Sequence, residues 1–394
     1  MAAPRAKRRR RSGKVVDFTP SPSRTPRRTR IAITGGAGLL GSRLVRALAA
    51  RGGADVLVLD LAPASDMPRD VAHRFLNLNL PFADGTLLKI LNEERPDVLV
   101  HLAALRSPSR DVVYAHELNS LGALHVLAAA GEADVPRVVM GSTTLVYGAR
   151  GDNPNYLTEA HALRPDPRDA FVRDFVEAEQ FAKDHARRYP QSKVAVLRFV
   201  PLLAPELRDY RSKMFAAPAV VSLLGYDPLV QALHVDDAMK ALLLALEKPD
   251  LEGVFNVAPD GVLPLSTVYL LFGTLPVPVP HPAAYALIEA AWLAGIGVMP
   301  GVHAHYFRYL CLADNAKAKR VLGFAPEHTT LDVVLATAKA RRGRHRLLDW
   351  DALEETAKRA AFRLQADLGR GNVPSTPPRT RPAETGARRL SKVS

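Results

Sequence analysis

The chain has 394 residues, of which 47% are hydrophobic and 24% charged, a composition that excludes a wholly disordered or fibrous protein. Cys311 is the only cysteine in the sequence, which excludes an intramolecular disulfide and any multi-cysteine zinc site. The formal net charge of +13 would indicate nucleic-acid binding only if it were spread over the folded part of the chain.

The basic charge is concentrated at the two ends of the chain. Residues 1–30 carry eleven Lys or Arg residues and one acid, and residues 371–394 carry five and one, so the body between them is nearly neutral. Both ends are rich in Pro, Ser and Thr and poor in aromatic residues, which predicts disorder. We call them the basic tails. They are either simply solvated or bind anionic lipid or nucleic acid, because charge alone names no partner.

Between the tails, short apolar runs alternate with longer helical stretches, the pattern of a parallel sheet covered by helices. The runs predict strands at 31–34, 55–59, 98–102, 138–140 and 194–197. The helical stretches are at 39–51, 111–130 and 170–188. The predicted fold class is therefore α/β, a doubly wound parallel sheet (Rossmann) in a dinucleotide-binding domain at 31–200.

After residue 200 several prolines break the chain, which predicts a smaller C-terminal cap domain at 201–345. Segments near 233–245 and 253–257 are expected to return to the sheet, and a C-terminal helix is expected at 346–370. The stretch 283–299 is almost entirely apolar, but Glu289 interrupts it and it is shorter than the ~20 residues that span a bilayer. It is expected to be a buried cap helix or a lipid-facing one, not a transmembrane span.

A glycine-rich turn follows the first predicted strand. Gly35 permits the tight turn, Gly38 allows the backbone to approach a pyrophosphate, and Gly41 allows the helix to pack on the strand. The helix N-terminus then offers free N–H groups to the phosphates. Asp60, at the end of the second strand, is placed to accept hydrogen bonds from both hydroxyls of the adenosine ribose, and its charge repels a 2′-phosphate. The pattern predicts NAD rather than NADP as cofactor.

The turn 34–41 resembles that of the extended short-chain dehydrogenase/reductases, the family of NAD-dependent nucleotide-sugar epimerases and dehydratases such as UDP-galactose 4-epimerase. Further motifs that resemble those of this family extend the match over residues 31 to about 335. They lie at 98–104, Asn119 with Gly122, 142–148, 197–199, 234–237, 255–257 and 316–324.

The resemblance implies a set of cofactor-binding residues. Asn77 and Leu78 would lie beside the adenine, where the Asn amide replaces the usual Asp and can still hydrogen-bond the base. The remaining members would hold the rest of the cofactor: Gly35, Gly38, Leu39, Leu40, Gly41, Asp60, Leu102, Ala103, Ala104 and Asn119.

The catalytic positions depart from the family. Its chemistry uses a Ser or Thr, a Tyr, and a Lys four residues after the Tyr, which lowers the pKa of the phenol. Thr143 fits the first role, but Phe171 and Phe175 stand at the Tyr and Lys positions, and neither can exchange a proton. Tyr156 and His161, in the preceding loop, are the remaining candidates, although nothing in the sequence fixes them at the site.

The substrate side departs as well. Pro201 stands where the family commonly has an Asn, and the segment 303–308 replaces an Arg-x-Gly-Asp-like motif. Arg208, Arg211, Lys213 and Arg308 are either anion contacts or solvated charges. His303 and His305 have poor spacing for a metal on a helix, so no metal site is predicted.

Three functions stay open at the level of sequence. The first is an NAD-binding epimerase/dehydratase-family protein that acts on nucleotide sugars or derives from enzymes that do. The second is a catalytically inactive dinucleotide-binding sensor or scaffold, and the third an oxidoreductase for a lipid-like substrate. A homodimer is expected, located in the cytoplasm or peripherally at a membrane.

Overall fold

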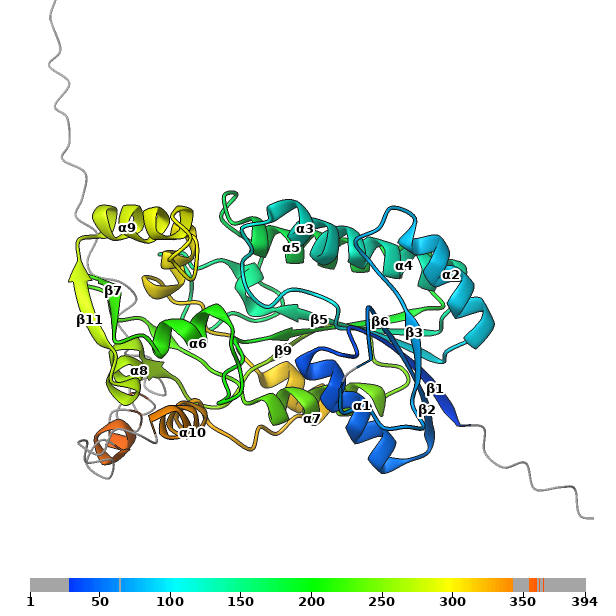
Figure 1. The fold of residues 1–394 in the computed structure, drawn as a ribbon. Coiled ribbons are helices and arrows are strands. Elements are labelled where there is room, and N and C mark those ends of the chain that lie inside the picture. The colour runs from blue at the N-terminus through cyan, green and yellow to red at the C-terminus, as the bar shows by residue number, and fades with distance from the viewer. Residues whose placement is uncertain (1–27, 64, 343–353, 360, 362–363, 365–394) are drawn as a thin grey trace, which may run out of the picture.

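The computed structural model describes residues 28–63, 65–342, 354–359, 361 and 364. Its centre is a seven-stranded parallel sheet in the order β3-β2-β1-β4-β5-β6-β9 (Figure 1). The strands are β1 (Thr29–Thr34), β2 (Ala54–Asp60), β3 (Ala72–Phe75), β4 (Val98–His101), β5 (Arg137–Thr143), β6 (Lys193–Phe199) and β9 (Gly253–Val257). The predicted doubly wound sheet is confirmed.

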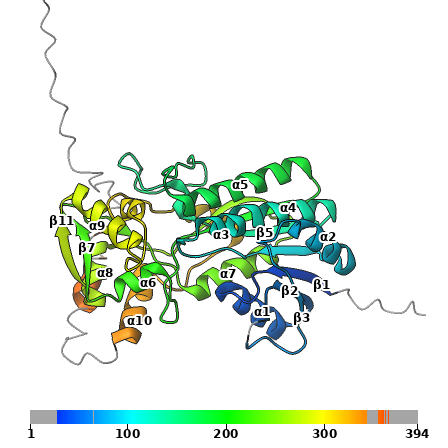
Figure 2. The ribbon, with the colours of Figure 1, turned by 45° about the horizontal axis from the view of Figure 1, so that its top comes forward.

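Helices cover both faces of this sheet. One face carries α1 (Leu39–Arg51) and α7 (Val235–Leu246), and the other carries α2 (Ala83–Glu94), α4 (Gly122–Glu132) and α5 (Ala170–Arg188) (Figures 1 and 2). The central strands are therefore apolar on both sides, as in β4, where all four residues are buried. This is why the strands are continuous hydrophobic runs in the sequence.

The differences between the predicted and the observed elements have local causes. Strand β3 is a mostly exposed edge strand with two basic residues, and α2 begins after Phe82 without a side-chain cap. The predicted helix 111–130 is interrupted: α3 (Val112–His116) passes into the π-helical turn η1 (Glu117–Leu121) before α4. Strand β1 begins at Thr29, two residues before the predicted boundary, because Thr29 and Arg30 continue the parallel pairing with β2 at Ala54 and Asp55.

The cap lies at one end of the sheet and has its own apolar core (Figure 1). Small elements build it: α6 (Tyr210–Phe215), β7 (Ala219–Leu223), β8 (Leu229–Val230), β10 (Leu263–Pro264), α8 (Leu265–Phe272), β11 (Leu275–Val279), α9 (His281–Leu293), η3 (Gly301–Phe307) and α10 (Thr330–Arg342). Between these stretches the chain returns to the sheet at α7 and β9, as the sequence predicted.

Helix α9 covers the apolar stretch only as far as Leu293, and the alternative of a buried cap helix is wrong. Ala284 is its one buried residue, while Leu293 is 76% exposed and nearby Ile296 is 81% exposed. The helix packs against η3 and β7 on one side only. Across the described residues, no helix has the length and apolar character needed to cross a bilayer.

The basic tails lie outside the described residues, apart from residues 28–30 at the start of the sheet. The predicted C-terminal helix at 346–370 is described only in part, and residues 354–359 of it are helical.

Candidate dinucleotide and substrate site

The glycine turn between β1 and α1 can be built only with glycine at two positions. Gly35 has φ +72°, and a Cβ there would lie 2.6 Å from the backbone nitrogen of Ala103. A Cβ on Gly41 would lie 2.1 Å from the carbonyl oxygen of Gly35. Gly38 is the N-cap of α1, and no side chain caps this helix end. The first-turn N–H groups of α1 are therefore left for an anionic ligand.

Asp60 reaches back from the end of β2 to this turn. Its Oδ2 accepts a hydrogen bond from the Ala37 N–H at 2.9 Å, and its Oδ1 accepts one from Leu61 at 2.7 Å. A carboxylate has about four acceptor positions, so both oxygens can still accept from the hydroxyls of a ribose. The position fits the role predicted for it.

A cavity of about 330 Å³ opens beside Asp60, and we call it the outer cavity. It brings together eight of the predicted cofactor residues: Gly35, Gly38, Asp60, Asn77, Leu78, Leu102, Ala103 and Ala104. Asn119 lines neither this cavity nor the one described next. It is buried in η1, and its Oδ1 accepts from the Leu105 N–H at 2.8 Å, so it supports the loop after β4 from behind.

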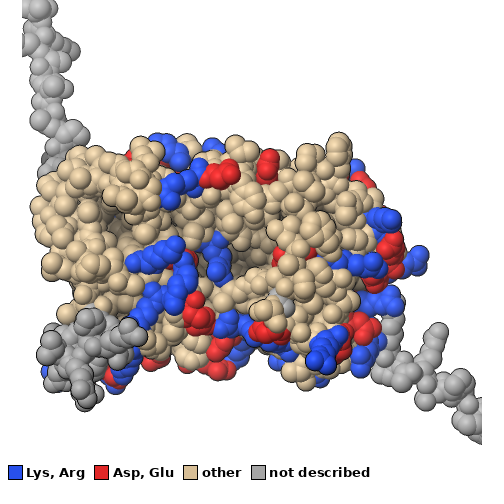
Figure 3. Space-filling view, viewed as in Figure 1, with Lys and Arg blue, Asp and Glu red and all other residues tan. Residues whose placement is uncertain are grey.

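A second cavity of about 370 Å³ continues from the first and shares Gly35, Gly38, Leu102 and Ala104 with it. We call it the inner cavity. It lies between the ends of the sheet strands and the cap, and Figure 3 shows a hollow near the middle of this face with basic side chains beside it. Its walls include Leu39, Leu40, Gly41, Thr143, Pro201 and both Phe171 and Phe175.

The inner cavity has an aromatic wall at residues 171 and 175, the positions of the family's Tyr and Lys. The rings of Phe171 and Phe175 are buried and meet edge to face, with centroids 5.2 Å apart. Thr143 stands at the end of β5, where its Oγ1 accepts from the Leu145 N–H at 3.3 Å. The predicted Thr is therefore at the cavity, and the wall facing it has neither phenol nor ammonium.

Tyr147 is committed to a buried network away from the cavity. Its hydroxyl donates to Asn256 Oδ1 and accepts from Arg198, both at 2.8 Å. Burial raises the pKa of Tyr147 to about 12, although Arg198 opposes the shift. Tyr156 packs beside a separate small cluster, and the His161 ring bonds to Thr158, so neither loop candidate lines the inner cavity.

Four polar residues at the inner cavity or directly behind it were not predicted as a group. Tyr210 lines the cavity, and its hydroxyl accepts from Arg211 Nε at 2.7 Å. The same hydroxyl lies 3.2 Å from Nδ1 of His303, whose Nε2 lies 3.1 Å from Oδ1 of Asp169. Burial raises the pKa of Tyr210, and the Arg211 cation opposes the rise. From the sequence, Arg211 was considered only as an anion contact and His303 only as a rejected metal ligand, while Asp169 precedes α5 as its N-cap.

Two arginines add positive charge to the inner cavity, one of them considered from the sequence. Arg211 was an anion candidate and does line the cavity, whereas Arg308 bonds to Tyr226 in the cap. Arg106 was missed. It is exposed and lies near Asp209, and desolvation by the surrounding protein lowers its pKa. It is fully charged at neutral pH because a guanidinium does not deprotonate there.

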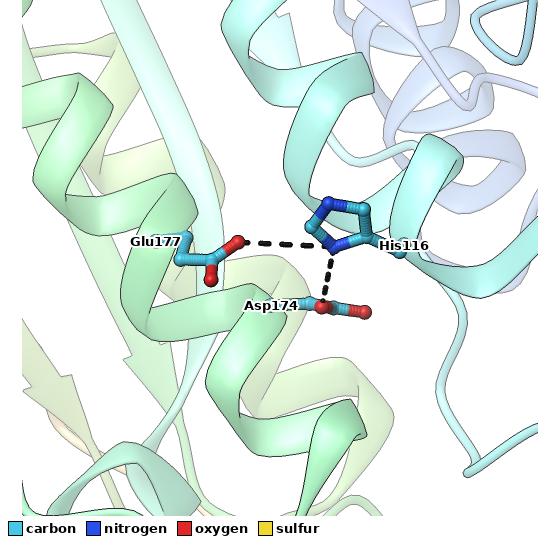
Figure 4. Close-up of side chains that lie close together, drawn as sticks. All are labelled: His116, Asp174 and Glu177. Atoms are coloured by element: carbon cyan, nitrogen blue, oxygen red, sulfur yellow. Dashed lines mark hydrogen bonds and ion pairs between the residues drawn. The ribbon is translucent and has the colours of Figure 1, made fainter. Parts of the chain in front are cut away.

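A separate cluster joins α3 to α5, and Figure 4 shows its three side chains converging. His116 Nδ1 lies 2.9 Å from Asp174 Oδ1 and 3.7 Å from Glu177 Oε2. The three groups could hold a metal ion, but Ser120 also donates to Glu177 at 2.8 Å, and ordinary ion pairing accounts for the arrangement. Burial raises the pKa of Asp174, and the hydrogen bond with His116 opposes this.

The sequence of this chain matches the profile of the NAD-dependent epimerase/dehydratase family over residues 31–258. The chain therefore belongs to this NAD-dependent family, as the resemblance of its motifs implied. The outer cavity fits the cofactor in this structure: the glycine turn leaves bare backbone at an uncapped helix end, and Asp60 keeps free acceptor positions beside it.

Three relatives show how varied similar chains are. An uncharacterized protein of Mycobacterium tuberculosis, Rv0501, is 30% identical over 77% of this chain and 81% of its own length. A 3-diazoavenalumate denitrifying reductase from a Streptomyces species is 29% identical, covering 76% and 96%. A 4-hydroxy-2-methyl-3-oxo-4-farnesyl-3,4-dihydroquinoline-1-oxide ketoreductase of Stigmatella aurantiaca is 28% identical, covering 75% and 92%.

Solved structures share the fold. The UDP-glucose 4-epimerase of Thermus thermophilus, determined in complex with NAD, superposes with a TM-score of 0.59 at 22% identity. The match covers 80% of this chain and all of the other. At this identity the likeness establishes the architecture of sheet and cap and nothing about the substrate.

Proposed function

We propose that this protein is an NAD-dependent oxidoreductase that reduces or oxidises an apolar, ring-bearing substrate in the inner cavity. The observation that carries the proposal is the aromatic wall. The aromatic wall of Phe171 and Phe175, together with Phe199, makes one side of the inner cavity apolar beside the glycine turn. Aromatic faces of this kind favour stacking with a flat apolar ligand over contact with a hydroxyl-rich sugar.

The charged residues narrow the substrate class further. Arg106 and Arg211 line the same cavity as the phenyl rings, and both are cations at neutral pH. An apolar ring that carries an anionic or strongly polar group would satisfy both parts of the cavity. Two of the relatives described above are reductases named for ring-bearing substrates, which supports this class.

We assign the cofactor to both cavities. Asp60, Asn77 and Leu78 would hold the adenosine, and the N-terminus of α1 at Gly38 to Gly41 the pyrophosphate. Leu39, Leu40, Leu102, Ala103 and Ala104 would line its path, with Thr143 at the reacting end. When bound, the nicotinamide supplies or accepts hydride. Without an ammonium at Phe175, its ribose lacks a charge-assisted contact, so binding should be weaker than is usual for this fold.

Nucleotide-sugar epimerisation is the second candidate, favoured by family membership alone. It needs a group that removes and returns a proton at a sugar hydroxyl, and the residues at the positions of the family's Tyr and Lys cannot do so. A purely cofactor-binding protein is the third candidate.

The deciding experiment compares the candidates on the full chain. Purified protein is incubated with NADH and a panel of aryl aldehydes and ketones, with 4-formylbenzoate as the first probe, and NADH oxidation is followed by absorbance. Parallel samples contain NAD+ and UDP-glucose or UDP-galactose. Aldehyde reduction without epimerisation supports the proposal. Epimerisation at ordinary enzyme rates contradicts it, and cofactor binding without either reaction supports the third candidate.

A matched variant tests the role of the aromatic wall. Phe171→Tyr with Phe175→Lys places the family's pair in the cavity. We expect NAD+ to bind about 10-fold tighter, since a charge-assisted hydrogen bond contributes roughly 1.5 kcal/mol or more. Gln180→Tyr with Asp184→Lys, two exposed positions of α5 with the same i, i+4 spacing, is the control and should leave the affinity unchanged. Equal NAD+ affinity of the first variant and the wild type would show that residue 175 does not face the cofactor.

We also propose two properties of the whole chain. The exposed apolar side of α9 and the basic tails would favour a peripheral lipid contact. A homodimer is the expected assembly, and size-exclusion chromatography with light scattering would establish it.

A further inference from the structure

A buried chain of hydrogen-bonding groups ends at the inner cavity. It runs from Asp169, the N-cap of α5, through His303 of η3 to Tyr210 of α6. Asp169 is 2% exposed and His303 is not exposed at all. The other end of this hydrogen-bonded series is Tyr210, which is 4% exposed and lines the cavity. The series therefore connects a fully buried acid to a tyrosine beside the space where a ligand would lie.

The surroundings of Tyr210 place it close to the phenyl wall. The His303 ring lies between two aromatic rings, with its centroid 5.9 Å from that of Phe171 and 5.4 Å from that of Tyr210. The Tyr210 hydroxyl, 3.2 Å from His303 Nδ1, is thus linked through this imidazole to the side chain at the expected Tyr position. Arg211 Nε, 2.7 Å from that hydroxyl, provides a positive charge next to it.

Two atoms of this group have unmet hydrogen-bonding capacity. Among the described residues, Arg211 Nη2 and Asp169 Oδ2 are buried without any hydrogen-bond partner. Leaving a buried polar atom unpaired is costly, so each of these two atoms favours a water molecule or a ligand atom as its partner. The unpartnered guanidinium nitrogen belongs to a side chain that lines the inner cavity, although this nitrogen is itself buried.

We infer that Tyr210 is the proton-transfer residue of this site, with Arg211 stabilising its oxygen and the His303–Asp169 pair supplying the proton. This inference rests on the proposed oxidoreductase function. The protein thereby carries the phenol of Tyr210 and the cation of Arg211 on the cap side, in place of the Tyr and Lys that α5 lacks.

The proton path balances in the direction of reduction. With His303 as imidazolium, Nε2–H donates to Asp169, Nδ1–H donates to the Tyr210 oxygen, and the phenolic O–H is free for a substrate carbonyl. The hydride for the carbonyl carbon would come from NADH held at the glycine turn. As the C=O π bond breaks, the carbonyl oxygen takes the Tyr210 proton, and the Tyr210 oxygen takes the Nδ1 proton of His303. The products are the alcohol, NAD+ and a neutral imidazole, and oxidation reverses each transfer.

The first test needs no turnover. 4-Nitrophenolate is an aromatic oxyanion that mimics the alkoxide facing Tyr210, and its binding to the full chain saturated with NAD+ is measured by calorimetry. We expect Tyr210→Phe to weaken binding about 10- to 100-fold, because a hydrogen bond to a charged group is lost while the ring is kept. Tyr226→Phe is the matched control: its hydroxyl also accepts from an arginine, Arg308 at 2.8 Å, but it does not line the cavity.

Each result of this binding comparison either supports the inference or overturns it. No binding to the wild type, or equal affinity of wild type and Tyr210→Phe, overturns the inference. If Tyr210→Phe fails to fold, Arg211→Gln replaces it, with the same expected direction of change, since it removes the cation beside the oxyanion; unchanged affinity would then overturn the inference.

The second test addresses the relay and keeps the two proposals distinct. In the reduction of 4-formylbenzoate by NADH, His303→Gln should lower kcat about 100-fold with KM nearly unchanged, since the amide can bond to Asp169 and Tyr210 but cannot pass a proton. A variant with wild-type kcat overturns the relay. If the wild type reduces no aldehyde of the panel, the proposed function fails, whereas the binding comparison still decides whether Tyr210 donates to an oxyanion.

Discussion

We expect Asp60 to determine which dinucleotide fits the outer cavity, and it also holds the glycine turn through Ala37. The two roles separate in variants. Asp60→Asn keeps an acceptor for the Ala37 N–H but removes the charge, so we expect NAD(H) affinity to fall by about 1 to 2 kcal/mol and discrimination against NADP(H) to disappear. Asp60→Ala should lose more, because the turn loses its support as well. Calorimetric titration with both cofactors measures this, and a wild type that prefers NADP(H) would contradict it.

His101 makes stability depend on pH. It is buried in β4 with Nδ1 2.8 Å from Thr34 Oγ1, and burial lowers its pKa from 6.5 to about 4. Between those values the unfolded chain binds a proton that the folded chain does not. The free energy of unfolding should therefore fall as the pH drops from about 6.5 to 4, by up to roughly 3 kcal/mol from this residue.

Urea denaturation at several pH values tests the expectation, with His101→Asn as the comparison. The amide can still bond to Thr34 but does not titrate. The difference in unfolding free energy between the two proteins should change across that interval and stay constant above it. A constant difference throughout would show that folding does not change the pKa of His101, which contradicts the expectation.

At the level of elements, one buried ion pair joins helix α5 to the sheet. Arg198 of β6 donates to Glu179 of α5 at 2.9 Å, and Ser142 of β5 donates to the same carboxylate at 2.6 Å. Glu179→Ala should destabilise the protein by about 3 to 5 kcal/mol, since it leaves the buried guanidinium without its carboxylate. Adding Arg198→Met should recover a large part of the loss. Chemical denaturation measures both, and a loss below about 1 kcal/mol for the single variant would contradict the expectation.

The helices and strands that could be predicted are those whose sequence carries a continuous local pattern. Helices α1 and α5 have the predicted bounds because helical periodicity follows a glycine turn in one case and an Asp N-cap in the other. Strand β3 was missed because an exposed edge strand lacks the apolar run of its buried neighbours. The glycine turn could likewise be predicted from one short stretch, and Asp60 from its distance along the sequence to that stretch.

The proton-relay residues could not be predicted in that way. Asp169, Tyr210 and His303 come from three segments separated by tens of residues, and only the packing of the cap on α5 brings them together. Each residue alone has an ordinary interpretation as a helix cap or a core aromatic. Long-range proximity of this kind leaves no local pattern in a single sequence.

For the whole molecule, we expect that the positive charge of the basic tails can be removed without loss of the fold. A chain without residues 1–27 and 371–394 keeps β1 and every other described element, and loses most of the net positive charge. We expect its melting temperature to stay within a few degrees of the full chain, because the removed residues are rich in charged, Pro, Ser and Thr residues and poor in aromatic ones. Binding of the full chain to anionic vesicles or DNA, where observed, should be lost with the tails. Cooperative destabilisation on truncation would contradict this.

The cap is assembled from three separate stretches of chain, since α7, β9 and the segment around η4 (Ala318–Leu322) return to the sheet between them. No single cut and insertion in the gene could exchange this cap for another. Recombination of contiguous segments would split its core, so a lineage carrying this architecture diversifies its chemistry one substitution at a time. Tyr210 and His303, in different stretches of the cap, would then have to be acquired by separate mutations and retained together.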